Sequence, residues 1–113
     1  MDAVRPRTAL ITGASRGLGF WLSWALARRG WSVALMARRR PLLEAAAEEI
    51  RQAAGAGSDV IYEAGDVADE QARLRLVNQV AERWGRLHLL ANNASLLGPT
   101  PLPRLADFPV DAL

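Results

Sequence analysis

Four short apolar runs alternate with three longer stretches in which apolar residues recur at helical spacing. The short runs lie at 8–12, 32–37, 59–63 and 87–92. The second run is continuously apolar over 33–36, which is typical of a strand buried on both faces by helices. The pattern therefore predicts four strands joined by helical connections.

Three helices are predicted between these strands, each with one apolar face. Their expected ranges are 16–29, 41–54 and 69–84. The face of the first helix expected to lie on the sheet comprises Leu18, Leu22, Ala25 and Leu26. The corresponding stripe of the third helix comprises Leu74, Val77, Val80 and Ala81. Asp69 is expected to cap the third helix, and the second helix should turn Glu44, Glu48 and Glu49 toward solvent.

Strands that alternate with helices imply a parallel sheet with right-handed crossovers. We expect an α/β, Rossmann-like, doubly wound fold with strand order 3-2-1-4 and a ligand over the switch point between strands one and four. The chain, residues 1–113, is expected to form a single partial domain that is truncated after strand four. Residues 96–113 are expected to be an irregular, proline-rich tail that leads into the start of a helix.

Composition narrows the classes of function. Half of the 113 residues are hydrophobic, and the absence of cysteine excludes disulfides, a thiolate nucleophile and a Cys-ligated zinc site. The basic residues are dispersed apart from the cluster at 38–40, and the net charge is only +2, so nucleic acid is not an expected partner. No segment approaches the length that spans a bilayer, and residues 1–7 lack the apolar core of a signal peptide. We expect a cytoplasmic protein without a membrane partner.

A glycine-rich loop at 12–19 joins the first strand to the first helix. Gly13 is expected to permit the turn off the strand, Gly17 to let backbone approach a pyrophosphate, and Gly19 to let the helix pack close to the sheet. The helix N-terminus that follows favours a bound phosphate. The spacing is Gly-x-x-x-Gly-x-Gly rather than Gly-x-Gly-x-x-Gly, so an ordinary strand-to-helix turn is the alternative interpretation.

The loop sequence Thr-Gly-Ala-Ser-Arg-Gly-Leu-Gly at 12–19 resembles the cofactor loop of the short-chain dehydrogenase/reductase family. A second motif, Asn-Asn-Ala-Ser at 92–95, resembles the family's Asn-Asn-Ala-Gly, with Ser95 in place of the glycine. The resemblance covers nearly the whole chain but only the N-terminal, cofactor-binding half of a family member. It implies that a nicotinamide dinucleotide contacts the loop through Gly13, Ser15, Arg16, Gly17, Leu18 and Gly19.

The residues after the second strand favour NADP (NADPH) over NAD. An acidic residue at this place usually binds the ribose 2′-hydroxyl of NAD, but here Ala37 is followed by Arg38, Arg39 and Arg40. Guanidinium groups form charge-assisted bonds with phosphate, so we expect Arg38, helped by Arg39, to bind the 2′-phosphate. The family resemblance adds Arg16 as a second clamp. Arg40 is better interpreted as a solvated residue at a helix start, and the same alternative stays open for Arg38.

Two further segments acquire a role from the resemblance. Asp66 and Val67 by themselves indicate only a loop that approaches a helix, whereas in the family an Asp-Val pair at this place contacts the adenine. The family motif also makes Asn92, Asn93 and Ala94 candidates for cofactor contact. Small residues and amides at a strand end also tie neighbouring strands together, so cofactor contact and a purely structural role both remain open for that motif.

No catalytic residue is predicted within these residues. The family's hydride transfer uses a Tyr-x-x-x-Lys pair, but this chain has no lysine, and Tyr62, its only tyrosine, is followed four positions later by Asp66. His88, the only histidine, has no partner at metal-ligand spacing, so a packing role is expected for it and no metal is predicted.

We therefore expect the cofactor-binding portion of an NADP-dependent oxidoreductase, inactive by itself. The complete enzyme would transfer hydride between the nicotinamide and a small carbonyl or alcohol substrate. The alternative is a non-enzymatic nucleotide-binding module completed by self-association or by a partner. A methyltransferase-like protein is disfavoured, because its cofactor ribose usually requires an acid where Arg38 stands. The open edge of strand four predicts marginal stability and a homo-oligomer formed through that edge.

Overall fold

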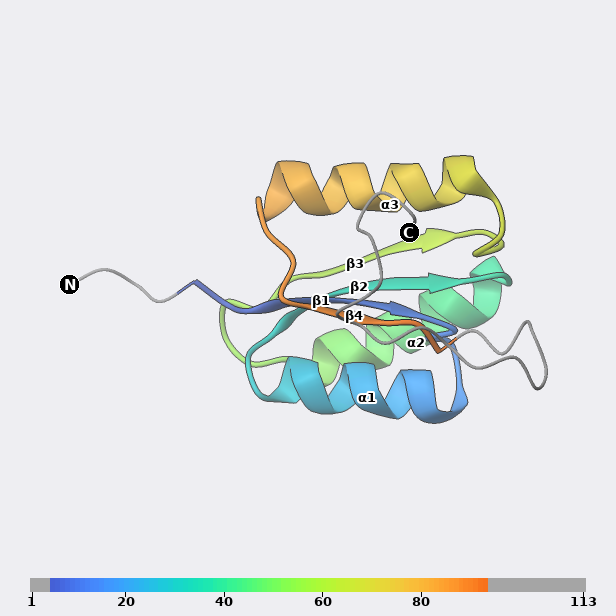
Figure 1. The fold of residues 1–113 in the computed structure, drawn as a ribbon. Coiled ribbons are helices and arrows are strands. Elements are labelled where there is room, and N and C mark those ends of the chain that lie inside the picture. The colour runs from blue at the N-terminus through green and yellow to red at the C-terminus, as the bar shows by residue number, and fades with distance from the viewer. Residues whose placement is uncertain (1–4, 94–113) are drawn as a thin grey trace.

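The computed structural model describes residues 5–93, in which strands and helices alternate strictly (Figure 1). The elements are β1 (Thr8–Thr12), α1 (Gly17–Arg28), β2 (Ser32–Ala37), α2 (Arg40–Ala53), β3 (Val60–Ala64), α3 (Glu70–Arg83) and β4 (Leu89–Ala91). Ala94, Ser95 and the tail expected at 96–113 lie outside the described residues.

The four strands form one parallel sheet in the order β3-β2-β1-β4, which confirms the predicted topology. In this register Leu10 of β1 lies between Ala34 of β2 and Leu90 of β4. Helices α1 and α2 cover one face of the sheet and α3 covers the other (Figure 1). The fold is therefore doubly wound, with three layers.

Alternating side chains of the strands fill two separate apolar cores. Ala9 and Ile11 of β1 pack with Leu43 and Ile50 of α2 on one face of the sheet. Leu10 belongs to the other core, which includes Ala34, Met36, Ile61, Leu76 and Val80. Every residue of β1 and β2 is buried, which confirms the burial on both faces that was predicted for the second strand.

The buried face of α1 agrees with the predicted one only in part, because Leu22 and Leu26 pack against the core while the helix is most deeply buried along small residues. Its buried residues are Gly19, Ser23 and Ala27, whereas Leu18 is 74% exposed. Small residues at the contact bring the helix axis close to the sheet, and this leaves the larger side chains at its flanks. The hydroxyl of Ser23 donates to the carbonyl of Gly19 at 2.7 Å, so its burial leaves no polar atom unpaired.

The predicted stripe of α3 is confirmed at Val77 and Val80 but not at Leu74, and the predicted cap is confirmed. Its buried residues are Ala72, Leu76 and Val80, and Leu74 is exposed. The Asp69 carboxylate accepts a hydrogen bond from the Gln71 amide at 3.0 Å, as expected of an N-cap. The three glutamates of α2 are exposed, as predicted.

Strand β4 is shorter than the predicted 87–92, because side chains occupy the start of its pairing with β1. The Thr8 amide donates to Nδ1 of His88 at 3.0 Å, and the Thr8 hydroxyl donates to the Arg86 carbonyl at 2.7 Å. Regular pairing starts only at Ala9 with Leu89. His88 therefore joins two strand ends, which is the packing role expected of it.

Candidate functional site

The carboxyl ends of the four parallel strands meet at one edge of the sheet, where the loops that follow them form a cavity. The connection after β1 leads to a helix on one face, and the connection before β4 comes from a helix on the other face. The crevice between β1 and β4 is thus the topological switch point of the sheet, the place where doubly wound proteins bind ligands.

Two glycines shape the loop between β1 and α1. Gly13 and Gly17 both have positive φ, of 62° and 63°, a conformation that other residues rarely adopt. An added Cβ at Gly17 would meet nothing within 4 Å, so this position is open toward the cavity. Helix α1 then begins without a side-chain cap or an acidic residue in its first turn. Its first N–H groups have no partner within the helix and suit an anion.

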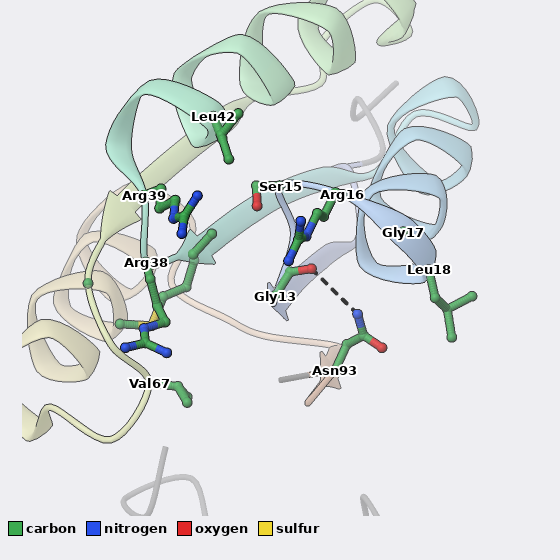
Figure 2. A pocket seen from close by; sticks show the side chains of 13 residues that line it. Gly13, Ser15, Arg16, Gly17, Leu18, Arg38, Arg39, Leu42, Val67 and Asn93 are labelled. Atoms are coloured by element: carbon green, nitrogen blue, oxygen red, sulfur yellow. Dashed lines mark hydrogen bonds between the residues drawn. The ribbon is translucent and has the colours of Figure 1, made fainter. Parts of the chain in front are cut away.

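Gly19 permits a close approach of the helix to the strand ends. A Cβ at this position would overlap the carbonyl oxygen of Gly13 and lie 2.7 Å from Nδ2 of Asn93. The side-chain amide of Asn93 donates from Nδ2 to that same Gly13 carbonyl at 3.4 Å (Figure 2). The predicted packing role of Gly19 is confirmed. The hydrogen bond from Asn93 joins the glycine loop to the end of β4.

The cavity has a volume of about 800 Å³, within the range typical of ligand pockets. Figure 2 shows the side chains around it, contributed by the start of α1, the end of β2, the start of α2, the loop after β3 and the end of β4. The predicted site residues that line it are Gly13, Ser15, Arg16, Gly17, Leu18, Arg38, Arg39, Val67 and Asn93. Residues far apart in the sequence therefore meet as predicted.

Three arginines give the cavity its positive charge. Arg16 comes from the glycine loop, and Arg38 and Arg39 come from the turn after β2 (Figure 2). Arg38 Nε lies 4.0 Å from Oδ2 of Asp66, and both side chains are largely exposed, so this ion pair is weak. Among the described residues Arg16 and Arg39 have no carboxylate partner. Their guanidinium groups are available to an anionic ligand.

The loop after β3 forms one wall of the cavity. Val67 lines it, whereas Asp66 lies beside it with its Oδ1 accepting from the Ala68 amide at 2.9 Å. The loop packs tightly on α3, because a Cβ at Gly65 would lie 2.7 Å from that of Ala72. Asp66 therefore does not line the cavity itself, but its Oδ2 faces Arg38, which does.

The end of β4 is fixed to β1 through a buried hydroxyl. Thr12 Oγ1 donates to Oδ1 of Asn92 at 3.1 Å and accepts from the backbone amide of Asn93 at 2.9 Å. Asn92 thus ties the strands and does not line the cavity, whereas Asn93 does both. Ala94, the remaining candidate of this motif, lies outside the described residues.

Sequence reasoning missed four lining residues: Met36, Ala37, Leu42 and Gly65. Met36 and Ala37 end a strand, and Gly65 directly precedes Asp66, so their places at the sheet edge followed from the topology alone. Leu42 is 45% exposed although it is apolar, and no periodicity distinguishes it from a surface leucine.

Other candidate chemistry is limited within residues 5–93. The Tyr62 hydroxyl donates to Oε2 of Glu44 at 3.1 Å and joins β3 to α2, and neither residue lines the cavity. The described residues contain no cluster of three or more His, Cys, Asp or Glu suited to a metal. None of the described helices has the length and apolar character required to cross a membrane.

The sequence of the chain is similar to that of one protein family. A family model described as short chain dehydrogenase matches residues 7–113. The 11-beta-hydroxysteroid dehydrogenase A of Sesamum indicum is 35% identical over 107 residues, which cover 95% of this chain and 30% of that protein. The 1-deoxy-11-beta-hydroxypentalenate dehydrogenase of Streptomyces avermitilis is 34% identical over 110 residues, 97% of this chain and 39% of that protein.

Solved structures agree in fold and in sequence. The L-sorbose reductase from Gluconobacter frateurii, complexed with NADPH and L-sorbose, has a TM-score of 0.72 and 31% identity over 80% of this chain and 34% of its own. An alcohol dehydrogenase from Thermococcus sibiricus, complexed with 5-hydroxy-NADP, has a TM-score of 0.66 and 37% identity over 76% of this chain and 36% of its own. The chain spans about a third of the length of these relatives.

Proposed function

The chain belongs to the short-chain dehydrogenase family, and from this premise we propose that its cavity binds NADP(H) as the cofactor-binding part of an NADP-dependent oxidoreductase. One observation carries the proposal. Arg16, Arg38 and Arg39 line the same cavity as the glycine loop, and no carboxylate follows β2 where NAD-binding proteins usually have one. NADPH and 5-hydroxy-NADP in the related structures support the choice of cofactor.

The pyrophosphate is assigned to the start of α1. The unpaired N–H groups of the first helical turn and the helix dipole both attract its charge. Gly17 leaves room there for backbone to approach the phosphate, since nothing lies within 4 Å of the place that a Cβ would take. Ser15 and Leu18 also line this part of the cavity and complete its wall.

The 2′-phosphate of the adenosine ribose is assigned to the arginines. Each guanidinium offers a planar fork of donors that matches phosphate oxygens. Arg38 meets Asp66 through its Nε edge, so its two Nη atoms stay available for the phosphate. Arg16 approaches the cavity from the other side, and Arg39 adds a third positive charge (Figure 2).

The adenine is assigned to the β3 end of the cavity, with Val67 as its wall and Asp66 beside it. The pyrophosphate lies over β1 and the ribose over the end of β2, so the base extends toward the next strand, β3. At the opposite end, Asn93 and the neighbouring Ala94 are assigned to the ribose on the nicotinamide side. Asn93 is held in place for this contact by Thr12 and Gly13.

The bound nucleotide supplies or accepts the hydride, with a small carbonyl or alcohol compound as its counterpart in the complete enzyme. The residues of this chain bind and orient the nucleotide but offer no Tyr-x-x-x-Lys acid and base, because the chain has no lysine. The proposal therefore assigns binding without turnover to these residues. The absence of cysteine suits a reducing compartment, and we assign the protein to the cytoplasm.

A titration of the purified chain with NADPH and with NADH, followed by nicotinamide fluorescence, tests this function. We expect NADPH to bind about tenfold or more tightly than NADH, because charge-assisted bonds to the 2′-phosphate favour NADPH. Equal affinities would contradict the proposed selectivity, and a folded chain that binds neither nucleotide would contradict the proposed function.

The unpaired edge of β4 favours a second candidate, a non-enzymatic nucleotide-binding module completed by self-association at that edge or by a partner. In the described residues β4 pairs with β1 alone, so one of its edges carries no strand. Sedimentation of the chain with and without NADPH separates the candidates. A defined, nucleotide-dependent oligomer supports the module, and a monomer that binds NADPH supports the oxidoreductase portion.

A further inference from the structure

Arg73 occupies an unfavourable place for a cation. It is the fourth residue of α3, whose N-terminal turn carries the positive end of the helix dipole. Its Nε is buried without a hydrogen-bond partner in the part of the chain that the structure describes. A buried donor left unpaired costs free energy, so the unpaired Nε offsets part of the stability that the other contacts of the guanidinium provide. Stability alone does not account for this arginine.

The guanidinium has one strong contact. Nη1 of Arg73 donates to the carbonyl of Val67 at 2.6 Å. Val67 lines the cavity, and Arg73 itself does not. The arginine therefore acts on the site through the backbone of a lining residue.

This contact completes the attachment of the loop after β3. The Gly65 amide donates to the Ala37 carbonyl of β2 at 2.8 Å, and Asp66 closes a turn with the Ala68 amide at 2.9 Å. Among the described hydrogen bonds, the one from Arg73 is the only one made to Val67 itself. Without the guanidinium, the Val67 carbonyl loses this hydrogen bond, and only the packing of its side chain against the core holds the residue.

We propose that Arg73 is a positioning residue of the nucleotide site, which holds the Val67 carbonyl so that the loop after β3 forms a fixed wall for the adenine. This inference rests on the proposed function, which assigns the adenine to the β3 end of the cavity. Because NADPH and NADH share the adenine, Arg73 acts on both nucleotides alike, unlike Arg38.

The test compares Arg73→Met with Arg75→Met. Both variants remove one positive charge from α3 and keep an unbranched side chain. Arg75 pairs with Glu63 at 3.0 Å and does not line the cavity. We expect Arg73→Met to weaken NADPH and NADH by the same factor, about threefold to tenfold, which is the scale of one hydrogen bond. Its Tm should stay unchanged or rise, and Arg75→Met should leave both affinities unchanged.

A loss of affinity without a loss of Tm distinguishes positioning from a merely structural role. Unchanged affinities in Arg73→Met would overturn the inference, and so would a fall in Tm together with affinity. A larger loss for NADPH than for NADH would assign the effect to charge instead. If the wild-type chain binds neither nucleotide, the proposed function fails, and hydrogen exchange still tests the contact. Unchanged exchange at the Ala68 amide of Arg73→Met would then overturn the inference, and faster exchange would support it.

Discussion

At the scale of single residues, the site depends on small groups that let backbone and charge come close together. Gly19 shows this most clearly, because its missing Cβ is what allows the first turn of α1 to rest against the Gly13 carbonyl and Asn93. Gly17 serves a different purpose, since the space beside it is open and its backbone has positive φ. The two glycines therefore predict different consequences of the same substitution.

Gly19→Ala should lower the free energy of unfolding by about 1–3 kcal/mol, because the added methyl group meets backbone that cannot move aside. Helix propensity alone predicts the opposite sign, a gain of about 1 kcal/mol. Urea unfolding of the two proteins decides between them. A Gly19→Ala variant as stable as the wild type would mean that α1 does not lie against Gly13.

Gly17→Ala serves as the comparison. It should cost about 1–2 kcal/mol from left-handed backbone strain. In contrast to Gly19→Ala, it should leave the NMR signal of the Asn93 side-chain amide in place.

At the scale of elements, hydrophobic pattern predicted the strands well and the helix faces less well. Strands β1 and β2 were predicted at their observed bounds, because their apolar runs are too short for a buried helix and indicate buried strands. The face of α1 was predicted only in part: Leu22 and Leu26 pack against the core, but the closest contact is made by Gly19, Ser23 and Ala27, which carry little hydrophobic signal. Close packing by small residues is a property of the pair of elements, and it is not visible in one helix.

The site was predicted in the same uneven way. Loops that carry glycine, arginine or asparagine were identified from their chemistry. Met36, Ala37 and Gly65 were missed because their contribution is a position at the sheet edge, and Leu42 was missed because nothing in the sequence distinguishes it from a surface leucine. Arg73 was missed because its role depends on a bond to a backbone carbonyl, which no sequence spacing indicates.

The tie between β1 and β4 gives a prediction at this scale. Thr12→Val preserves the shape of the buried side chain but removes the hydroxyl that holds Asn92 and Asn93. Leaving these polar groups unpaired should cost about 1–3 kcal/mol. Hydrogen exchange at the Asn93 amide should become faster. Thr12→Ser retains the hydroxyl and should keep exchange slow; fast exchange in both variants would show that the hydroxyl is not the tie.

At the scale of the whole molecule, the cavity lies where loops from all four strands converge. A ligand that fills it therefore contacts residues from all four of these segments at once. Because β4 pairs with β1 over only three residues, we expect the chain by itself to have low stability. Ligand binding should then be visible as a large change in thermal stability.

NADPH at about 100 times its Kd should stabilise the folded chain by about 2.7 kcal/mol, which corresponds to a rise in Tm of roughly 10 °C or more. NADH at the same concentration should give a smaller rise. Differential scanning fluorimetry over a range of nucleotide concentrations measures both. Equal shifts for the two nucleotides would indicate that the 2′-phosphate contributes nothing.

The most direct test of the central claim is a titration of Arg38→Ala with NADPH and NADH beside the wild type. Arg40→Ala is the matched control, since Arg40 is an exposed neighbour that does not line the cavity. We predict that Arg38→Ala weakens NADPH by about 1.5–3 kcal/mol, leaves NADH nearly unchanged, and that Arg40→Ala changes neither. Equal weakening of both nucleotides by Arg38→Ala, or no weakening of either, would contradict the assignment of this cavity to NADP.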